Sequence, residues 1–294
     1  SEFPSYWRMT SLPTFDGNTW TVSEDLLNSA AGELANLSSL SEVGVATTDV
    51  MQLFTIQSLT GTFAPVADRP TQLRSATRSL FFEPESGTLL VSKEGLKYND
   101  NYQIVSTVIV PSADALRISS SSSPPDAQYL ELPQIQELFQ IQQVVDQIIQ
   151  GSTGNYEKLL AMQSYFRNNF VYSLDVPAST SGDATIDFLT RKSGYCEQFS
   201  STFALFARLI GIPSRVAIGF TPGEASPIGT SNVQLFNVRG QHAHAWPEVW
   251  FDGIGWVPFE PTPGRGSPDS VAYTGVAPAQ ATGSGNPDPG TGPQ

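Results

Sequence analysis

The chain is 294 residues long; 39% of its residues are hydrophobic and 15% are charged, and it contains 24 Gly and 22 Pro. This length allows one large domain or two ordinary ones, and the composition favours strands and turns over a helical bundle. Lys and Arg number 15 against 28 Asp and Glu, and the formal charge of -13 argues against nucleic acid as a partner because phosphate is repelled. With a single cysteine the chain forms no intrachain disulfide.

The first region, residues 1–125, is predicted to be rich in β-structure. Three runs between residues 45 and 116 are rich in β-branched and aromatic residues and are separated by turn-forming residues. These runs are DVMQLFTIQSLTG, RSLFFEPESGTLLVS and NYQIVSTVIVP. The opening stretch YWRMTSLPTFDGNTW carries aromatics around an Asp-Gly turn signal, which predicts an edge hairpin. The Ser-rich and Pro-rich segment at 117–128 marks the domain boundary.

The second region, residues 126–264, begins with helical patterns and ends with strands. Three sets of apolar residues recur at spacings of three and four, which predicts three amphipathic helices. These sets are Ile135, Leu138, Ile141, Val145 and Ile148; Leu159, Met162 and Phe166; and Phe199, Phe203, Phe206 and Ile210. SRVAIGF then indicates a strand, and HAHAWPEVWFDGIGWVPFEPTPG indicates a hairpin that turns at residues 252–255. Residues 265–294 are rich in Pro, Gly and Ser and have the composition of a flexible tail or linker.

Cys196, the lone cysteine, lies in the first turn of the third predicted helix. Unpaired backbone N–H groups and the positive end of the helix dipole favour the thiolate there, and the thiolate is the form that attacks carbonyl carbon. From the helix alone, the favoured alternative is an inert structural thiol, because free Cys is often buried and Cys196 extends the apolar stripe.

The only two histidines, His242 and His244, both fall in the predicted strand QHAHAW and would share one face of it. Two residues of separation, with no nearby Cys and no third His, make a poor metal site, so we expect a general base, with no metal and no cofactor. On the return strand, Glu260 is a candidate to orient the imidazole. A three-residue loop would put Glu260 opposite Trp246 on the face of His244, whereas an even-length loop would put it on the other face.

Three blocks, GYCEQFSSTFALFARLIGIPSRVAIGF, HAHAWPEVW and GWVPFEPTPG, resemble the Cys, His and acid blocks of the transglutaminase-like superfamily over about residues 186 to 264. The resemblance implies an α+β fold with a papain/transglutaminase-like core, in which helices pack on an antiparallel sheet, preceded by the β-rich domain. It implies that Cys196 is the nucleophile, His244 the base and Glu260 the orienting acid, and His242 matches no catalytic position. The family usually has Asp where this chain has Glu260.

The function that this resemblance implies is cysteine-dependent acyl transfer on protein or peptide amides, through a thioester at Cys196. A cysteine protease or amidase with the same triad is an alternative, and so is a non-catalytic extracytoplasmic binding module. The order of segments also resembles the extracytoplasmic region of bacterial multi-spanning membrane proteins. That resemblance implies a place at the extracytoplasmic face of the cell membrane. The chain itself has no apolar run of the roughly 18 to 20 residues needed to cross a bilayer. Any transmembrane segments are therefore expected to flank this sequence.

Overall fold

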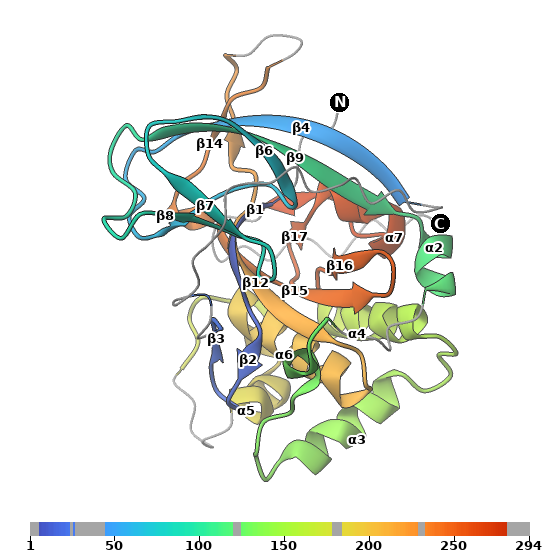
Figure 1. The fold of residues 1–294 in the computed structure, drawn as a ribbon. Coiled ribbons are helices and arrows are strands. Elements are labelled where there is room, and N and C mark those ends of the chain that lie inside the picture. The colour runs from blue at the N-terminus through green and yellow to red at the C-terminus, as the bar shows by residue number, and fades with distance from the viewer. Residues whose placement is uncertain are drawn as a thin grey trace.

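The computed structural model describes residues 6–23, 26, 45–119, 125–177, 184–228 and 233–280. A central sheet lies between a layer of helices and an arch of strands from the first half of the chain (Figure 1). The fold is therefore the mixed one expected, with a helix-covered antiparallel sheet and a β-rich N-terminal region. None of the described helices is both long enough and apolar enough to span a membrane.

The central sheet is antiparallel and has four strands, in the order β1, β12, β15, β16. They are β1 (Trp7–Leu12), β12 (Ser214–Phe220), β15 (Ala243–Phe251) and β16 (Gly255–Pro258). The edge strand β1 comes from the N-terminal region and approaches β12 so closely that a Cβ at Gly219 would collide with the carbonyl oxygen of Trp7. The predicted edge hairpin follows β1 as β2 (Thr14–Phe15) and β3 (Trp20–Thr21). The predicted boundary at residue 125 is thus crossed by one sheet.

The helical layer covers one face of this sheet. It consists of α3 (Leu138–Ile148), α4 (Asn155–Asn169), α5 (Ala184–Arg191) and α6 (Cys196–Leu209), and three of these helices match the three predicted from periodicity. Their shared core is aromatic, and four of its rings pack against one another in stacked, tilted and edge-to-face pairs: Phe166, Phe188, Phe199 and Phe206. Side chains alternate along β15, so Ala245, Val249 and Phe251 join this core while His244, Trp246 and Glu248 point to the other face.

The N-terminal strands form two three-stranded sheets, which confirms the predicted β-structure between residues 45 and 116. One sheet has β4 (Val45–Thr55), β9 (Asn101–Pro111) and β6 (Pro70–Ala76), and the other has β5 (Phe63–Ala64), β8 (Thr88–Val91) and β7 (Leu80–Glu83). Short helices α2 (Ala113–Ile118) and η1 (Ala127–Leu130) lead to the helical layer. Between them, residues 120–124 of the predicted boundary segment lie outside the described residues.

The segment after residue 264, expected to be a tail or linker, is folded as far as residue 280. It forms β17 (Arg265–Gly266), η3 (Pro268–Ser270), α7 (Val271–Thr274) and β18 (Ala279–Gln280). Tyr273 anchors it, because this side chain is 3% exposed and its hydroxyl donates to the carbonyl of Pro258 at 2.8 Å. Burial of this aromatic side chain thus holds in place a segment whose polar composition suggested a linker. Residues 281–294 lie outside the described residues. The remaining short elements are β10 (Val171–Tyr172), β11 (Ser193–Gly194), β13 (Glu224–Ala225), β14 (Phe236–Asn237) and η2 (Gly240–His242).

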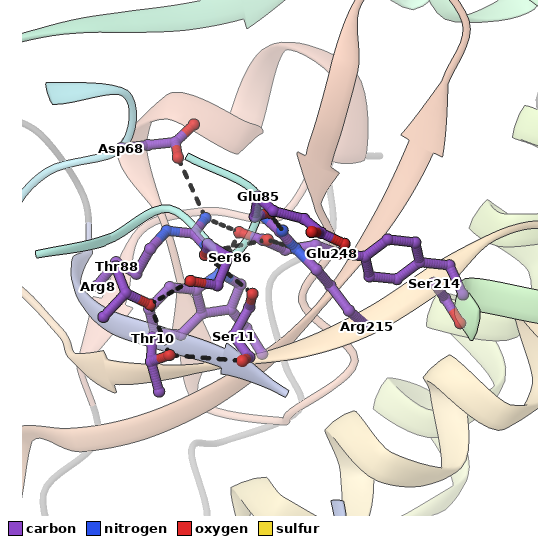
Figure 2. Close-up of polar contacts among 12 residues, drawn as sticks. Arg8, Thr10, Ser11, Asp68, Glu85, Ser86, Thr88, Ser214, Arg215 and Glu248 are labelled. Atoms are coloured by element: carbon purple, nitrogen blue, oxygen red, sulfur yellow. Dashed lines mark hydrogen bonds and ion pairs between the residues drawn. The ribbon is translucent and has the colours of Figure 1, made fainter. Parts of the chain in front are cut away.

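A buried ion network ties the N-terminal region to the central sheet (Figure 2). Glu248 accepts hydrogen bonds from Arg8 at 2.9 Å and from Arg215 at 2.8 Å, and all three side chains are at most 3% exposed. Burial opposes the charge of Glu248, but the two guanidinium groups outweigh it and lower the pKa of this carboxyl to about 2. Arg8 also pairs with Asp68 at 3.2 Å, and Arg215 donates to the carbonyl of Glu85 at 2.8 Å. The network thereby fixes β1, β12 and β15 against the β-rich region.

Candidate active site

Cys196 is the first residue of α6, as the sequence predicts. Tyr195 is extended and caps the helix, and its backbone N–H donates to the side-chain oxygen of Gln198 at 2.9 Å. The residue is half-buried, and it lies at the helix end where free N–H groups and the dipole favour negative charge. This is a position at which a cysteine is reactive rather than merely packed.

His244 and Glu260 meet across the hairpin of β15 and β16. Phe251 pairs with Gly255, so the loop has the three residues that put Glu260 on the His244 side. The imidazole Nε2 lies 2.7 Å from a carboxylate oxygen of Glu260, and the two residues are 3% and 1% exposed. The geometry therefore brings the predicted base and the predicted acid into direct contact, in surroundings where a charged hydrogen bond is strong.

The thiol of Cys196 and the imidazole of His244 also influence one another, since each shifts the pKa of the other. The Nδ1 atom of His244 is buried and makes no hydrogen bond of normal geometry within the described ranges. Burial raises the pKa of Cys196, but the nearby polar ring and charge of His244, then the Ala245 backbone and the charge of Arg265, lower it below its ordinary value. Burial lowers the pKa of His244, but Glu260 and Cys196 raise it to about 9. The two shifts together favour a thiolate-imidazolium pair.

The carboxylate of Glu260 is held by two further donors. The Tyr6 hydroxyl donates to the same oxygen that contacts His244, and the backbone N–H of Thr262 donates to the other oxygen at 3.0 Å. Burial raises the pKa of Glu260, but His244, Tyr6 and the charge of Arg167 lower it overall, so the acid stays ionised. The Tyr6 ring also meets the His244 ring edge to face at 5.1 Å. Tyr6 therefore supports both members of the pair.

Side chains on α4 hold the loop that carries Glu260. The Gln163 side-chain oxygen accepts from the Glu260 backbone N–H at 3.0 Å. One terminal nitrogen of Arg167 donates to the carbonyls of Glu260, Thr262 and Arg265, at 3.1, 2.7 and 3.0 Å. Sequence reasoning missed Tyr6, Gln163 and Arg167. For Gln163 and Arg167 a signal exists, since each follows an apolar position of the predicted helix and so lies beside its buried stripe.

His242 differs from the prediction, which put it on the same strand face as His244. The strand begins one residue later, and His242 closes the 3₁₀ turn η2. Its Nδ1 accepts from the Arg239 backbone N–H at 2.9 Å, and this local side-chain to backbone bond draws the residue into the turn. Burial is the main cause that lowers its pKa. His242 is therefore a structural residue of the turn, beside the site.

Within the described ranges, no three His, Cys, Asp or Glu side chains gather closely enough to hold a metal ion. Cys196 at the start of α6 and the contact between His244 and Glu260 are the arrangement expected for a nucleophile, a base and an orienting acid.

Comparison with known proteins identifies the class to which this geometry belongs. Residues 142–261 match the transglutaminase-like superfamily, and residues 1–113 match the TgpA N-terminal domain. The chain therefore carries a transglutaminase-like core behind a TgpA-type N-terminal region. The fold agrees with the crystal structure of the periplasmic domain of TgpA from Pseudomonas aeruginosa, with a TM-score of 0.63, 23% identity, and coverage of 88% of this chain and 82% of that chain.

Two curated relatives are similar in sequence over part of the chain. An uncharacterized protein, YebA, of Bacillus subtilis is 34% identical over 125 residues, which cover 41% of this chain and 17% of that protein. A protein-glutamine gamma-glutamyltransferase of Pseudomonas aeruginosa is 38% identical over 102 residues, which cover 34% of this chain and 14% of that protein. The chain thus spans less than a fifth of either relative.

Proposed function

We propose that the protein catalyses cysteine-dependent acyl transfer on protein or peptide amides, with Cys196 as nucleophile, His244 as general base and acid, and Glu260 as the group that orients and charges the imidazole. The observation that carries this proposal is the 2.7 Å contact between His244 and Glu260 beside a thiol with a lowered pKa. Membership of residues 142–261 in the transglutaminase-like superfamily supports it, as does the curated relative that is a gamma-glutamyltransferase.

The first half of the reaction forms a thioester. The Cys196 thiolate attacks the amide carbonyl, a carbon–sulfur bond forms, and the oxyanion is held by N–H groups at the start of α6. The His244 imidazolium gives its proton to the leaving nitrogen, the carbon–nitrogen bond breaks, and the amine departs. Glu260 stays ionised and stabilises the charged ring before this transfer.

The second half releases the acyl group. An amine attacks the thioester, neutral His244 takes its proton, and the carbon–sulfur bond breaks to restore the thiolate-imidazolium pair. When water attacks instead, the same steps hydrolyse the amide. The site chemistry is common to both outcomes, so the access of amine and water to the thioester decides between them.

The proposed place of action is the extracytoplasmic face of a bacterial cell membrane, with a protein or peptide as substrate and membrane-spanning segments in the parent protein. The fold match to a periplasmic domain supports this location. The acidic chain supports a protein substrate over nucleic acid, because its charge of -13 disfavours phosphate-rich partners.

The experiment measures incorporation of a fluorescent primary amine into a glutamine-containing protein, together with ammonia release as a measure of the first half-reaction. Wild type should show both, and Cys196→Ala should abolish both while changing the free energy of unfolding by no more than about 1 kcal/mol, because only one small, partly exposed side chain is lost. Ammonia release without amine incorporation would identify a hydrolase. No activity, with a thiol that iodoacetamide labels only after denaturation, would show a binding module instead.

A further inference from the structure

Arg265 is a buried cation with two guanidinium nitrogens that are not hydrogen-bonded. The residue is 2% exposed, and neither Nε nor Nη1 has a hydrogen-bond partner among the described residues. The guanidinium lies against the Tyr172 ring, whose centroid is 5.6 Å from the guanidinium carbon. Buried guanidinium groups are almost always paired, because desolvation of an unpaired charge is costly. A ligand that carries negative charge would provide the hydrogen-bond acceptors that this arginine lacks.

Arg265 lies beside the proposed nucleophile. Tyr172, whose ring it contacts, pairs in parallel with Gly194, and the next residue, Ser173, donates to the Gly194 carbonyl at 2.8 Å. Gly194 is two residues before Cys196, so the cation is next to the turn that presents the thiol. Both Tyr172 and Cys196 are partly exposed. Binding of a ligand at the guanidinium would therefore occur beside the thiol.

Further unpaired polar atoms lie on the segments that are bonded to Arg265. Seven buried side-chain nitrogen or oxygen atoms of the described residues lack a hydrogen-bond partner, and five of them belong to Arg265, Thr221, Thr262 and Ser267. Arg265 bonds through its backbone to Thr262 at 3.2 Å and lies two residues from Ser267. Such atoms are few in a folded protein, so their concentration in one place indicates a polar site rather than chance.

The segments that carry these atoms are fixed in place. Gln280 pairs with Arg265, and its side-chain amide bonds both the N–H and the carbonyl of Gly223, at 2.8 and 3.2 Å, two residues after Thr221. Arg167 holds the Arg265 carbonyl at 3.0 Å, and a Cβ at Gly266 would collide with the backbone carbonyl of Ala277. The backbone of Arg265 is thus preorganised, which lowers the entropic cost of binding.

We propose that Arg265 binds a carboxylate of the acyl-donor substrate and so positions the reacting amide at Cys196, which makes an acidic peptide the favoured donor. This inference rests on the proposed function. A guanidinium matches the planar carboxylate through charge-assisted hydrogen bonds, and the Thr262 and Ser267 hydroxyls add donors near it. The net charge of -13 repels an acidic peptide at long range. At the site itself, attraction between the Arg265 guanidinium and the carboxylate would oppose this repulsion.

The test compares two alkylating agents that differ in charge: iodoacetate, which carries a carboxylate, and iodoacetamide, its neutral counterpart. The ratio of their rates at Cys196 is measured in wild type, Arg265→Gln and Arg265→Lys. The control is Arg117→Gln, which removes one cation at an exposed ion pair on α2. Loss of a charge-assisted hydrogen bond should lower the iodoacetate-to-iodoacetamide ratio roughly tenfold in Arg265→Gln. Arg265→Lys should retain part of the preference, and Arg117→Gln all of it.

The two agents separate the inference from the proposed function on which it rests. If iodoacetamide labels native Cys196 rapidly but the iodoacetate-to-iodoacetamide ratio is equal in wild type and Arg265→Gln, the proposal of a carboxylate site is wrong. The proposal that Cys196 is the nucleophile is then unaffected. If iodoacetamide fails to label the native protein, the proposed function and the inference both fall.

A second measurement uses wild type alone, so it holds even where a variant does not fold. Acetate should slow the labelling of Cys196 by iodoacetamide in a saturable way, and acetamide at equal concentration should not. Equal effects of acetate and acetamide would overturn the proposal. Stronger protection by inorganic phosphate than by acetate, at matched ionic strength, would overturn the assignment to a carboxylate.

Discussion

The thiolate-imidazolium pair predicts an unusual pH profile for the alkylation of Cys196. The thiol pKa is lowered, chiefly by His244 acting against burial, and the His244 pKa is raised to about 9 by Glu260 and Cys196, again against burial. The pair therefore exists between these two values, and the thiolate persists in acid where a free thiol is protonated. The perturbation is a change of pH from 4 to 9.5, applied to wild type and to His244→Ala.

The magnitude follows from the shift of the imidazole. A rise from the ordinary value of 6.5 to about 9 corresponds to about 3 kcal/mol in favour of protonated His244. A free thiol with a pKa of about 8.5 is only about 0.3% thiolate at pH 6. A thiolate of lower pKa is also less nucleophilic, which offsets part of the gain. We expect wild type at pH 6 to react at least about tenfold faster than His244→Ala.

The assay is the rate of iodoacetamide labelling of Cys196, with mass spectrometry to confirm the labelled residue. Wild type should show a plateau that extends into acid, and His244→Ala should show one transition near the ordinary thiol pKa. His242→Ala is the matched control, because that ring bonds the backbone of Arg239 and not the thiol, so its profile should follow wild type. One transition near pH 8.5 in both wild type and His244→Ala would refute the reasoning.

Three further outcomes test the site and its supports. His242→Ala should keep most acyl transfer while His244→Ala loses it, since only His244 contacts the acid; equal losses in an amine-incorporation assay would contradict this. Glu248→Gln should lower the free energy of unfolding in urea by about 3 kcal/mol, because two buried guanidinium groups lose their carboxylate, whereas Glu94→Gln, at an exposed ion pair, should leave it unchanged. Tyr6→Phe should cost about 2 kcal/mol in the same assay, the worth of a buried hydrogen bond to a charged group; an unchanged urea midpoint would remove Tyr6 from the site.

Local signals were sufficient for the parts of the site that lie close together in the sequence. The apolar spacing from Phe199 to Ile210 predicted α6 and put Cys196 at its start, and the structure has both. The odd loop between β15 and β16 set the side of the sheet on which Glu260 lies, because the strand period is two. Helix period, turn length and strand alternation are properties of neighbouring residues, and one sequence is enough to read them.

Long-range contacts and local side-chain bonds could not be read in this way. The bond from Tyr6 to Glu260 joins residues 254 positions apart, and no pattern near either residue encodes it. The unpaired guanidinium of Arg265 is likewise visible only once β17 is packed. For His242 the period-two pattern gave the wrong element, because a bond from its ring to the Arg239 backbone favours a turn over a strand.

The N-terminal region contributes residues directly to the candidate active site. Strand β1 pairs with β12 at the edge of the central sheet, and Arg8 on this strand neutralises Glu248. The hydroxyl of Tyr6 donates a hydrogen bond to Glu260, the carboxylate that contacts His244. All of these contacts come from outside residues 142–261, the segment that matches the superfamily. Without them, β12 would expose a row of unpaired backbone N–H and C=O groups, and the buried carboxylates of Glu248 and Glu260 would each lose a hydrogen-bond donor. Both changes are unfavourable. The segment at 142–261 therefore reaches its full set of contacts only with the N-terminal strand in place, and the carboxylate of Glu260 is held in part by Tyr6, which lies outside that segment.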